Sequence, residues 1–280
     1  MKMKKWVYNT IVIALGVVFV VSACFLADYI IESIEQKNQY NDLADLVEQH
    51  RPTPPTGNTD PTKGGETTEP ATPPLVFVDV VNPNTGETVK VLQEYAQIYA
   101  LNPDLVGWIR IPGTRVNYPV MQTPDRPDYY LDKDFYGEPA RQGAIYAREV
   151  CDVNKPSDNI TLYGHHMQDG SMFADIMNYQ HKDFYNEHKY IYFDTLIEHH
   201  VYEVIASFKT TASVGQGFKY HSYVDFSDED QFAAFMRMVK GYDFFDTGLT
   251  AEYGDKLICL STCEYTLVNG RQVVVAKRIS

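Results

Sequence analysis

The sequence contains little cysteine and little positive charge. Its 280 residues include four cysteines (Cys24, Cys151, Cys259 and Cys263), with no Cys-x-x-Cys pair and no histidine cluster at metal-ligand spacing. No metal site and no cofactor are therefore expected. Basic residues number 24 against 37 acidic ones, a formal net charge of -13, and they form no stripe beyond the N-terminal lysines. Because nucleic-acid binding relies on clustered Lys and Arg, nucleic acid is not an expected partner.

The N-terminal region contains one long apolar run. Lysines within residues 1–5 precede a stretch, residues 6–27, that is about the length needed to cross a bilayer as a helix. Lysines stay on the cytoplasmic side of such a helix, so we expect a short cytoplasmic tail and a cell-membrane protein with everything after Asp28 outside the cell. A cleaved signal peptide is one alternative. A lipid anchor at Cys24 is the other, because Val-Ser-Ala-Cys24 loosely resembles a lipobox. Apolar residues continue past that point, which favours an uncleaved transmembrane anchor.

Two further segments separate this anchor from the folded part of the chain. Residues 28–50 have apolar positions at helical spacing and predict a juxtamembrane helix. Residues 51–74 are dominated by Pro, Thr, Gly and Glu, a composition that cannot bury a core and predicts a disordered stalk. The catalytic domain is expected over residues 75–280.

That domain has the pattern of a mainly β protein. Short runs rich in Val, Ile, Tyr and Phe are separated by turn residues, which is typical of a closed or nearly closed β-barrel. Three helical segments interrupt the runs. We expect an amphipathic helix over Val89–Leu101, a short helix over Met172–Tyr179, and a third helix that begins with a Ser-x-x-Asp capping pattern at Ser227 and Asp230.

Three polar residues lie at the ends of predicted strands. Cys263 follows the apolar strand that starts at Lys256, and Arg271 opens the last strand. His165 follows a glycine after the strand predicted over Ile160–Tyr163. Cys259 and Cys263 are about 13 Å apart along an extended strand, too far for a disulfide. A thiol, an imidazole and a guanidinium at strand ends can converge on one edge of a barrel and form a catalytic site.

These motifs resemble the sortase family, and in particular its class B. The Leu-Ser-Thr-Cys263 segment is close to the family's TLxTC signature, Tyr163-Gly-His165-His-Met is similar to the class B histidine segment, and Arg271-Gln-Val-Val-Val-Ala-Lys is similar to its arginine strand. The resemblance covers about residues 100–280, and the helix near Ser227 matches a class B insertion. It implies a sortase-type barrel and a cysteine transpeptidase of Gram-positive bacteria.

The chemistry explains the three residue types. Cys263 reacts as a thiolate, which a protonated His165 can stabilise before it protonates the leaving amine. Arg271 keeps its charge and can hold a substrate carbonyl or the developing oxyanion through two hydrogen bonds. The backbone N–H of Glu264 is a candidate second donor. By resemblance, the side chains that line the peptide groove are Ser261, Thr262, Tyr163 and Tyr223.

Other histidines and arginines are weaker candidates. His166 could replace His165, but strand alternation sends it to the opposite face. His199 and His200 lie in a predicted strand without a partner motif, and Arg278 is expected to be a solvated charge near the C-terminus.

The resemblance implies a reaction in which a sorting pentapeptide of the Asn-Pro-x-Thr-Gly/Asn type is cut after threonine. The acyl group is then transferred to an amine of a cell-wall peptidoglycan precursor or of a pilin. Alternatives are a membrane-anchored extracellular cysteine protease and a non-catalytic wall-binding module. The chain itself contains Asn82-Pro-Asn-Thr-Gly86. A turn is the favoured interpretation, and a pseudo-substrate is the alternative.

Overall fold

The structure is a computed structural model that describes residues 5–52 and 74–280. It divides into two units, one ending at Asp42 and one spanning Leu43–Ser280. The predicted tail (residues 1–5) and stalk (residues 51–74) lie almost entirely outside the described residues.

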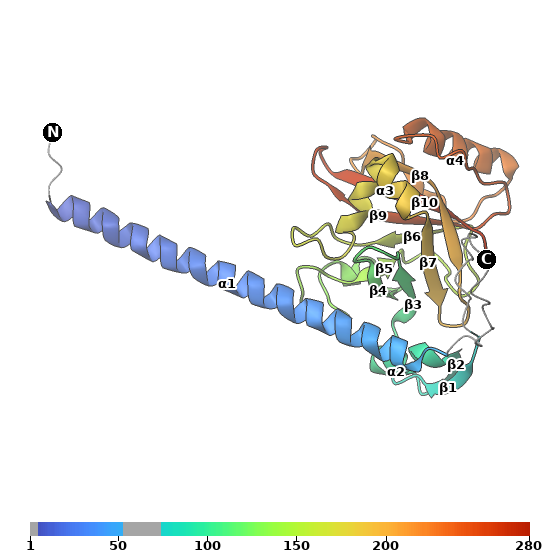
Figure 1. Ribbon diagram of the computed structural model, residues 1–280, viewed down its shortest axis with the longest axis horizontal. Helices are drawn as coiled ribbons and strands as arrows, with labels where there is room; N and C mark the ends of the chain where they lie inside the picture. Colours follow the sequence, from blue (N-terminus) through green and yellow to red (C-terminus); the bar gives the residue numbers. More distant parts are fainter. Residues whose placement is uncertain (1–4, 53–73) are drawn as a thin grey trace, which may run out of the picture. The chain divides into compact units, whose positions relative to one another are not determined.

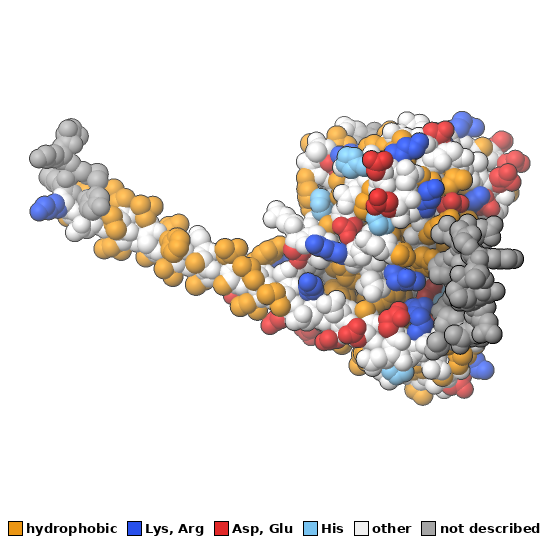
Figure 2. Space-filling view, in the orientation of Figure 1, with side chains coloured by type: hydrophobic (Ala, Val, Ile, Leu, Met, Phe, Trp, Pro, Cys, Tyr) orange, Lys and Arg blue, Asp and Glu red, His pale blue; other side chains and the backbone are white. Residues whose placement is uncertain are grey.

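The first unit is formed by helix α1 (Lys5–His50), which continues into the second unit. The helix is long and apolar enough to cross a membrane, by length and composition, and its most apolar window is fully exposed. Figure 2 shows its surface covered largely by hydrophobic side chains. The sequence predicted two helical segments here, whereas the structure has one continuous helix. The physical reason is that no proline or glycine lies between Gly16 and Pro52 to interrupt it.

The second unit is built on a closed barrel, as the sequence predicted. Among the described residues, the strands follow the order β10-β8-β7-β3-β4-β5-β6-β9 around the barrel (Figure 1). Their bounds are β3 (Leu105–Arg110), β4 (Asn117–Met121), β5 (Ile145–Ala147), β6 (Asn159–Tyr163), β7 (Tyr190–Thr195), β8 (Val201–Thr211), β9 (Leu257–Glu264) and β10 (Gly270–Arg278).

Strand direction brings three chain segments to one edge of this barrel. β9 runs parallel to β6 and antiparallel to β10. The carboxyl ends of β6 and β9 and the first residues of β10 therefore lie side by side. The loop after β6 and the tight turn between β9 and β10 both leave from this edge.

The segment from Val89 to Leu101 corrects one prediction. Val89–Leu101 is not one helix: it comprises part of β2 (Thr88–Leu92), the 3₁₀ turn η1 (Gln93–Tyr95) and the short helix α2 (Ala96–Leu101). β2 pairs with β1 (Phe77–Val81) as a separate two-stranded sheet. The apolar positions Val89 and Val91 alternate with exposed Thr88 and Lys90, which is a period of two rather than a helical period.

The remaining helices agree more closely with the sequence. The predicted short helix after Met172 is the 3₁₀ helix η3 (Ala174–Gln180), followed by α3 (Lys182–Glu187). Two short 3₁₀ turns, η2 (Tyr129–Leu131) and η4 (Tyr220–Ser222), lie in loops. The third predicted helix is α4 (Glu229–Tyr242), inserted between β8 and β9. Its N-cap is Asp228, which accepts the backbone N–H of Gln231 at 2.8 Å, rather than Ser227.

Helix α4 packs on the barrel through one apolar face. Phe232, Phe235 and Val239 are buried and belong to the same cluster as Phe208 of β8 and Val273 of β10. Burial of each large apolar side chain stabilises the fold by about 2 kcal/mol. This cluster supports the strands that present the polar edge described above.

Candidate active site

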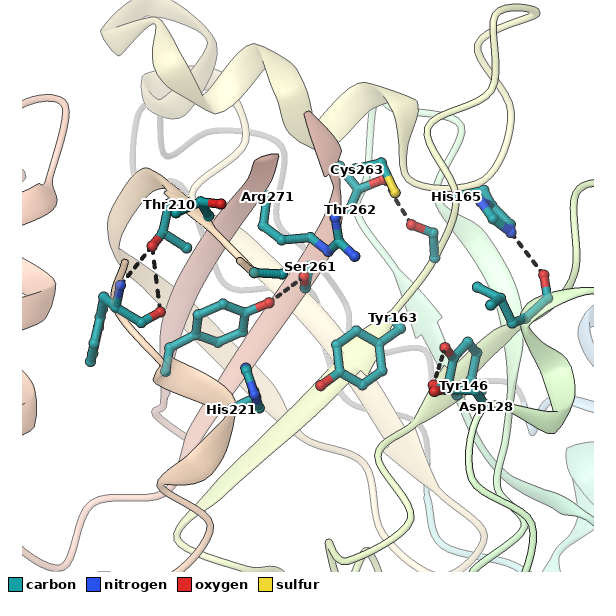
Figure 3. A pocket seen from close by; sticks show the side chains of 16 residues that line it. Asp128, Tyr146, Tyr163, His165, Thr210, His221, Ser261, Thr262, Cys263 and Arg271 are labelled. Carbon is teal, nitrogen blue, oxygen red and sulfur yellow. Dashed lines mark hydrogen bonds between the residues drawn. The ribbon is translucent and has the colours of Figure 1, made fainter. Parts of the chain in front are cut away.

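The cysteine and the arginine face each other across two paired strands. Cys263 on β9 is the register partner of Arg271 on β10. His165 lies two residues beyond the end of β6, whose last residue, Tyr163, pairs with Ser261. Figure 3 shows the three side chains around one opening, with Cys263 between Arg271 and His165. The structure thus brings His165 next to Cys263 and Arg271, although it lies 98 and 106 positions before them in the chain.

Backbone contacts hold the histidine loop against β9. The N–H of Gly164 donates to the carbonyl of Ser261 at 3.1 Å, and the Thr262 hydroxyl donates to the carbonyl of Gly164 at 2.7 Å. A side chain at position 164 would lie within 3 Å of the Ile145 and Phe173 side chains, so glycine lets the loop pack against these two residues. Ser261 and Thr262 therefore place His165 next to Cys263.

The thiol and the imidazole shift each other's proton affinity. Hydrogen bonding to His165 has the largest effect on Cys263 and, helped by the charge of Arg271, lowers the pKa of the thiol despite its partial burial. Hydrogen bonding to Cys263 likewise raises the pKa of His165, and the Leu131 carbonyl adds to this while burial opposes it. Both shifts favour a thiolate beside an imidazolium, the reactive form of a cysteine nucleophile.

One guanidinium nitrogen of Arg271 is already engaged by the protein. It donates to the carbonyl of Gly270 at 2.9 Å and to that of Asn269 at 3.5 Å. These bonds orient the side chain toward the cavity, where the planar group can present further N–H donors to a carbonyl oxygen.

The three residues line a cavity of about 230 Å³. Tyr163, Ser261 and Thr262, which the sequence assigned to the groove, line it as well. Its walls also include residues that sequence reasoning missed, several of them aromatic: Asp128, Leu131, Tyr146, Thr210, Phe218, Tyr220 and His221. These come from loops and strands far apart in sequence, and no local motif marks them.

One of the predicted groove residues, Tyr223, lies elsewhere. Tyr223 packs its ring against Phe218 and Phe235 at centroid distances of 6.1 and 5.2 Å and does not line this cavity. The Glu264 side chain is turned away from the cavity and is buried. It accepts from Lys209 at 3.1 Å and from the backbone N–H of Thr266 at 2.9 Å. Only the backbone of Glu264 remains a candidate donor at the site.

The other candidate histidines have different surroundings. His166 stacks on Tyr265 with ring centroids 5.4 Å apart and does not line the cavity. His199 contacts the carboxylates of Asp194 at 3.0 Å and Glu94 at 3.3 Å in a buried cluster. Glu94 comes from η1 and Asp194 from β7, and none of the three residues lines the cavity.

The Asn82–Gly86 segment forms the turn between β1 and β2. Asn82 Oδ1 accepts the N–H groups of Asn84 at 2.8 Å and Thr85 at 3.2 Å, and its amide donates to the Tyr99 hydroxyl at 2.9 Å. None of these residues lines the cavity. The segment is a turn in this structure, not an occupant of the groove.

Comparison with known proteins gives consistent matches. A family model of the sortase domain matches residues 109–279. Sortase B of Listeria monocytogenes is 32% identical over 199 residues, covering 70% of this chain and 78% of that protein. Sortase B of Staphylococcus aureus is 33% identical over 193 residues, covering 68% and 76%. A solved structure of the S. aureus protein aligns with a TM-score of 0.68 and 26% identity, over 89% of this chain and 99% of that chain.

Proposed function

Since this chain belongs to the sortase family and to its class B, we propose that Cys263, His165 and Arg271 carry out its transpeptidation at the carboxyl edge of the barrel. The proposal rests on one observation. Cys263 and Arg271 are register partners, and His165 comes from the parallel neighbouring strand, so all three meet in one cavity. The backbone N–H of Glu264 is the proposed second donor to the oxyanion.

In the first half of the reaction, the Cys263 thiolate attacks the carbonyl carbon of the threonine in a sorting peptide. Arg271 stabilises the negative charge that develops on the carbonyl oxygen. When the intermediate collapses, the peptide bond after threonine breaks and His165 gives its proton to the leaving amine. The products are a thioester on Cys263 and the released C-terminal fragment.

In the second half, an amine replaces that fragment. The amine transfers a proton to His165, attacks the thioester carbonyl and forms a new amide bond, while the Cys263 thiolate leaves. The enzyme returns to its thiolate and imidazolium state with no net change in protonation. Entry of an amine instead of water distinguishes a transpeptidase from a protease.

The proposed donor is a surface-protein sorting signal of the Asn-Pro-x-Thr-Gly/Asn type. The proposed acceptor is an amine of a peptidoglycan precursor or of a pilin. Two structural neighbours support these classes: a S. aureus sortase B-substrate complex and a sortase B complexed with triglycine. For this chain we also propose that α1 anchors the protein in the cell membrane, with its N-terminus cytoplasmic and the barrel outside.

The test uses quenched sorting peptides with and without added triglycine. Wild-type protein should cleave after threonine and, with triglycine present, give a joined product of the expected mass. Cys263→Ala should give neither product while remaining folded. Cys259→Ala is the matched control, because Cys259 lies on the same strand but is fully buried. Cleavage by Cys263→Ala would contradict the proposal, and hydrolysis without any joined product would indicate a protease.

A further inference from the structure

The loop that carries η2 contacts the active site through a backbone atom. Nε2 of His165 lies 2.7 Å from the carbonyl oxygen of Leu131, the last residue of η2. A carbonyl oxygen only accepts hydrogen bonds, so Nε2 must carry a hydrogen. This leaves Nδ1 as the nitrogen that gains and loses the proton, and it fixes the plane of the ring.

The tight turn that carries the Leu131 carbonyl is fixed by contacts on both of its sides. Before it, Asp128 has a left-handed backbone (φ 56°), and the N–H of Leu131 donates to the Asp128 carbonyl at 3.0 Å. On the other side, Gly143 packs closely against the turn, because a Cβ added there would lie within 3 Å of the carbonyl oxygens of both Tyr130 and Leu131. The N–H of Ala144 donates to the Tyr130 carbonyl at 3.0 Å.

One side-chain bond ties this turn to the barrel at the active site. The Tyr146 hydroxyl donates to Oδ1 of Asp128 at 2.8 Å. Tyr146 lies on β5, is the register partner of Tyr163 on β6, and packs its ring 5.4 Å from that of Tyr163. Figure 3 shows the Tyr146–Asp128 bond and, separately, the bond that His165 makes to the backbone of η2. A chain of contacts therefore runs from β5 through Tyr146, Asp128 and the Leu131 carbonyl to the imidazole.

We propose that Tyr146 and Asp128 are positioning residues: their hydrogen bond fixes the η2 turn, so that the Leu131 carbonyl holds His165 in the tautomer and orientation that proton transfer to and from Nδ1 requires. The inference rests on the proposed function, because it assigns His165 the proton transfer. A backbone carbonyl cannot be removed by substitution, which explains why no sequence motif marks this contact. The two side chains that place the carbonyl can be replaced.

Other ionisable groups also face His165. Their influence on its pKa must be distinguished from the influence of the Tyr146–Asp128 hydrogen bond. Cys263 on β9 and Arg271 on β10 both act on its proton affinity. Asp128 carries a negative charge in the same cavity, and His221 after β8 lines it as well. The effect of the hydrogen bond and the effect of the Asp128 charge can be separated with Asp128→Asn. Asparagine keeps the acceptor oxygen and tolerates a left-handed backbone but has no charge.

The main test measures the His165 pKa directly, by NMR titration of the imidazole in the full chain without substrate. Tyr146→Phe removes only the hydroxyl, and we expect a lower His165 pKa and a fall in kcat of about tenfold with little change in KM. Asp128→Ala should have the same effect. Asp128→Asn, which keeps an acceptor oxygen for the Tyr146 hydroxyl, should lower both values less than Asp128→Ala does. Tyr129→Phe is the matched control, because Tyr129 is adjacent to Asp128 but does not line the cavity.

The combined variant gives a second criterion. If the two residues act through one bond, Tyr146→Phe and Asp128→Ala together should lower the His165 pKa no further than either alone. An unchanged His165 pKa and kcat in Tyr146→Phe would overturn the inference. So would a rise in KM alone, which would identify Tyr146 as a substrate contact, or an Asp128→Asn effect equal to that of Asp128→Ala, which would identify a charge effect. Since the titration needs no turnover, its result stands even if the proposed reaction is wrong.

Discussion

At the scale of single residues, Arg271 is the residue whose chemical type matters most. Its guanidinium already uses one nitrogen to bind the Gly270 carbonyl. The remaining donors form a planar fork suited to one carbonyl oxygen. A lysine would keep the charge, but its single ammonium group could not match this planar fork while also binding the backbone carbonyl.

We therefore expect Arg271→Lys to lower kcat/KM by about a hundredfold, as loss of an oxyanion donor does. Peptide cleavage under single-turnover conditions measures the effect on acylation. Lys277→Arg, at the far end of the same strand, is the control for an exchange of one basic side chain for another away from the cavity. A variant rate within twofold of wild type would show that charge alone is sufficient at position 271.

The paired pKa shifts of Cys263 and His165 predict a measurable reactivity. Because hydrogen bonding to His165 is the largest influence lowering the thiol pKa, His165→Gln should move half-maximal alkylation of Cys263 to higher pH. In the wild type, activity should rise as the thiol ionises, below its usual pKa, and fall as the imidazole deprotonates, above its usual pKa. The rate of Cys263 alkylation, measured against pH in a Cys24→Ala background, reports ionisation of the thiol. Identical curves for the wild type and His165→Gln would refute the interaction between Cys263 and His165.

At the scale of elements, the turn between β9 and β10 holds the nucleophile and the clamp together. The Glu264 carboxylate stabilises this turn by accepting hydrogen bonds from the backbone N–H groups of Thr266 and Leu267 and from the amine of Lys209. The Glu264 side chain thus stabilises the strand pair, while its backbone N–H is the proposed donor to the oxyanion. Misalignment of this turn would separate Cys263 from Arg271.

Glu264 also predicts how stability depends on acid. Burial alone would raise its pKa, but the bonds from Thr266 and Lys209 outweigh it and lower the pKa from 4.5 to about 2. A lowered folded-state pKa stabilises the fold above the unfolded pKa, and this contribution is lost as the pH falls from about 4 to about 2. We expect Glu264→Gln to lower the free energy of unfolding near pH 6 by about 3 kcal/mol and to reduce the acid dependence. Urea unfolding at several pH values tests this, and parallel curves for both proteins would contradict it.

At the scale of the whole molecule, the last turns of α1 belong to the same unit as the barrel. Leu43 and Val47 are buried, and Arg51 lies 3.6 Å from the Asp194 carboxylate, which also accepts from the Tyr95 hydroxyl at 2.5 Å. Burial opposes ionisation of Asp194, yet its bonds to His199 and Tyr95 and the charge of Arg51 lower its pKa. We propose that the catalytic unit begins at Leu43.

This boundary can be tested with two shortened chains. A chain that begins at Leu43 should have a free energy of unfolding about 3 kcal/mol or more above that of a chain beginning at Leu75, because Leu43 and Val47 each bury a full side chain. A Leu43→Ala, Val47→Ala variant of the longer chain should lose most of this difference. Equal urea midpoints for the two chains would place the boundary at Leu75, as the composition suggested.

The sequence by itself determined the family, the mainly β class, the apolar anchor-length helix and the identity of three strand-end residues. Each of these depends on local pattern or on a short motif such as Leu-Ser-Thr-Cys263, which a single segment carries complete. It misassigned Val89–Leu101, where β-branched residues in a period of two alternate with polar ones and pairing with β1 decides the conformation.

Only the tertiary structure decided which side chains surround those three residues. Tyr146 reaches the cavity because β5, β6 and β9 are neighbours in the barrel, whereas Asp128 and Tyr220 reach it from the segments at η2 and η4. No local spacing in the sequence encodes either arrangement. The same holds for Glu264, whose orientation depends on Lys209 of β8, 55 residues away. The contact between His165 and the Leu131 carbonyl involves a backbone atom, which every residue type offers equally, so the sequence could not indicate it.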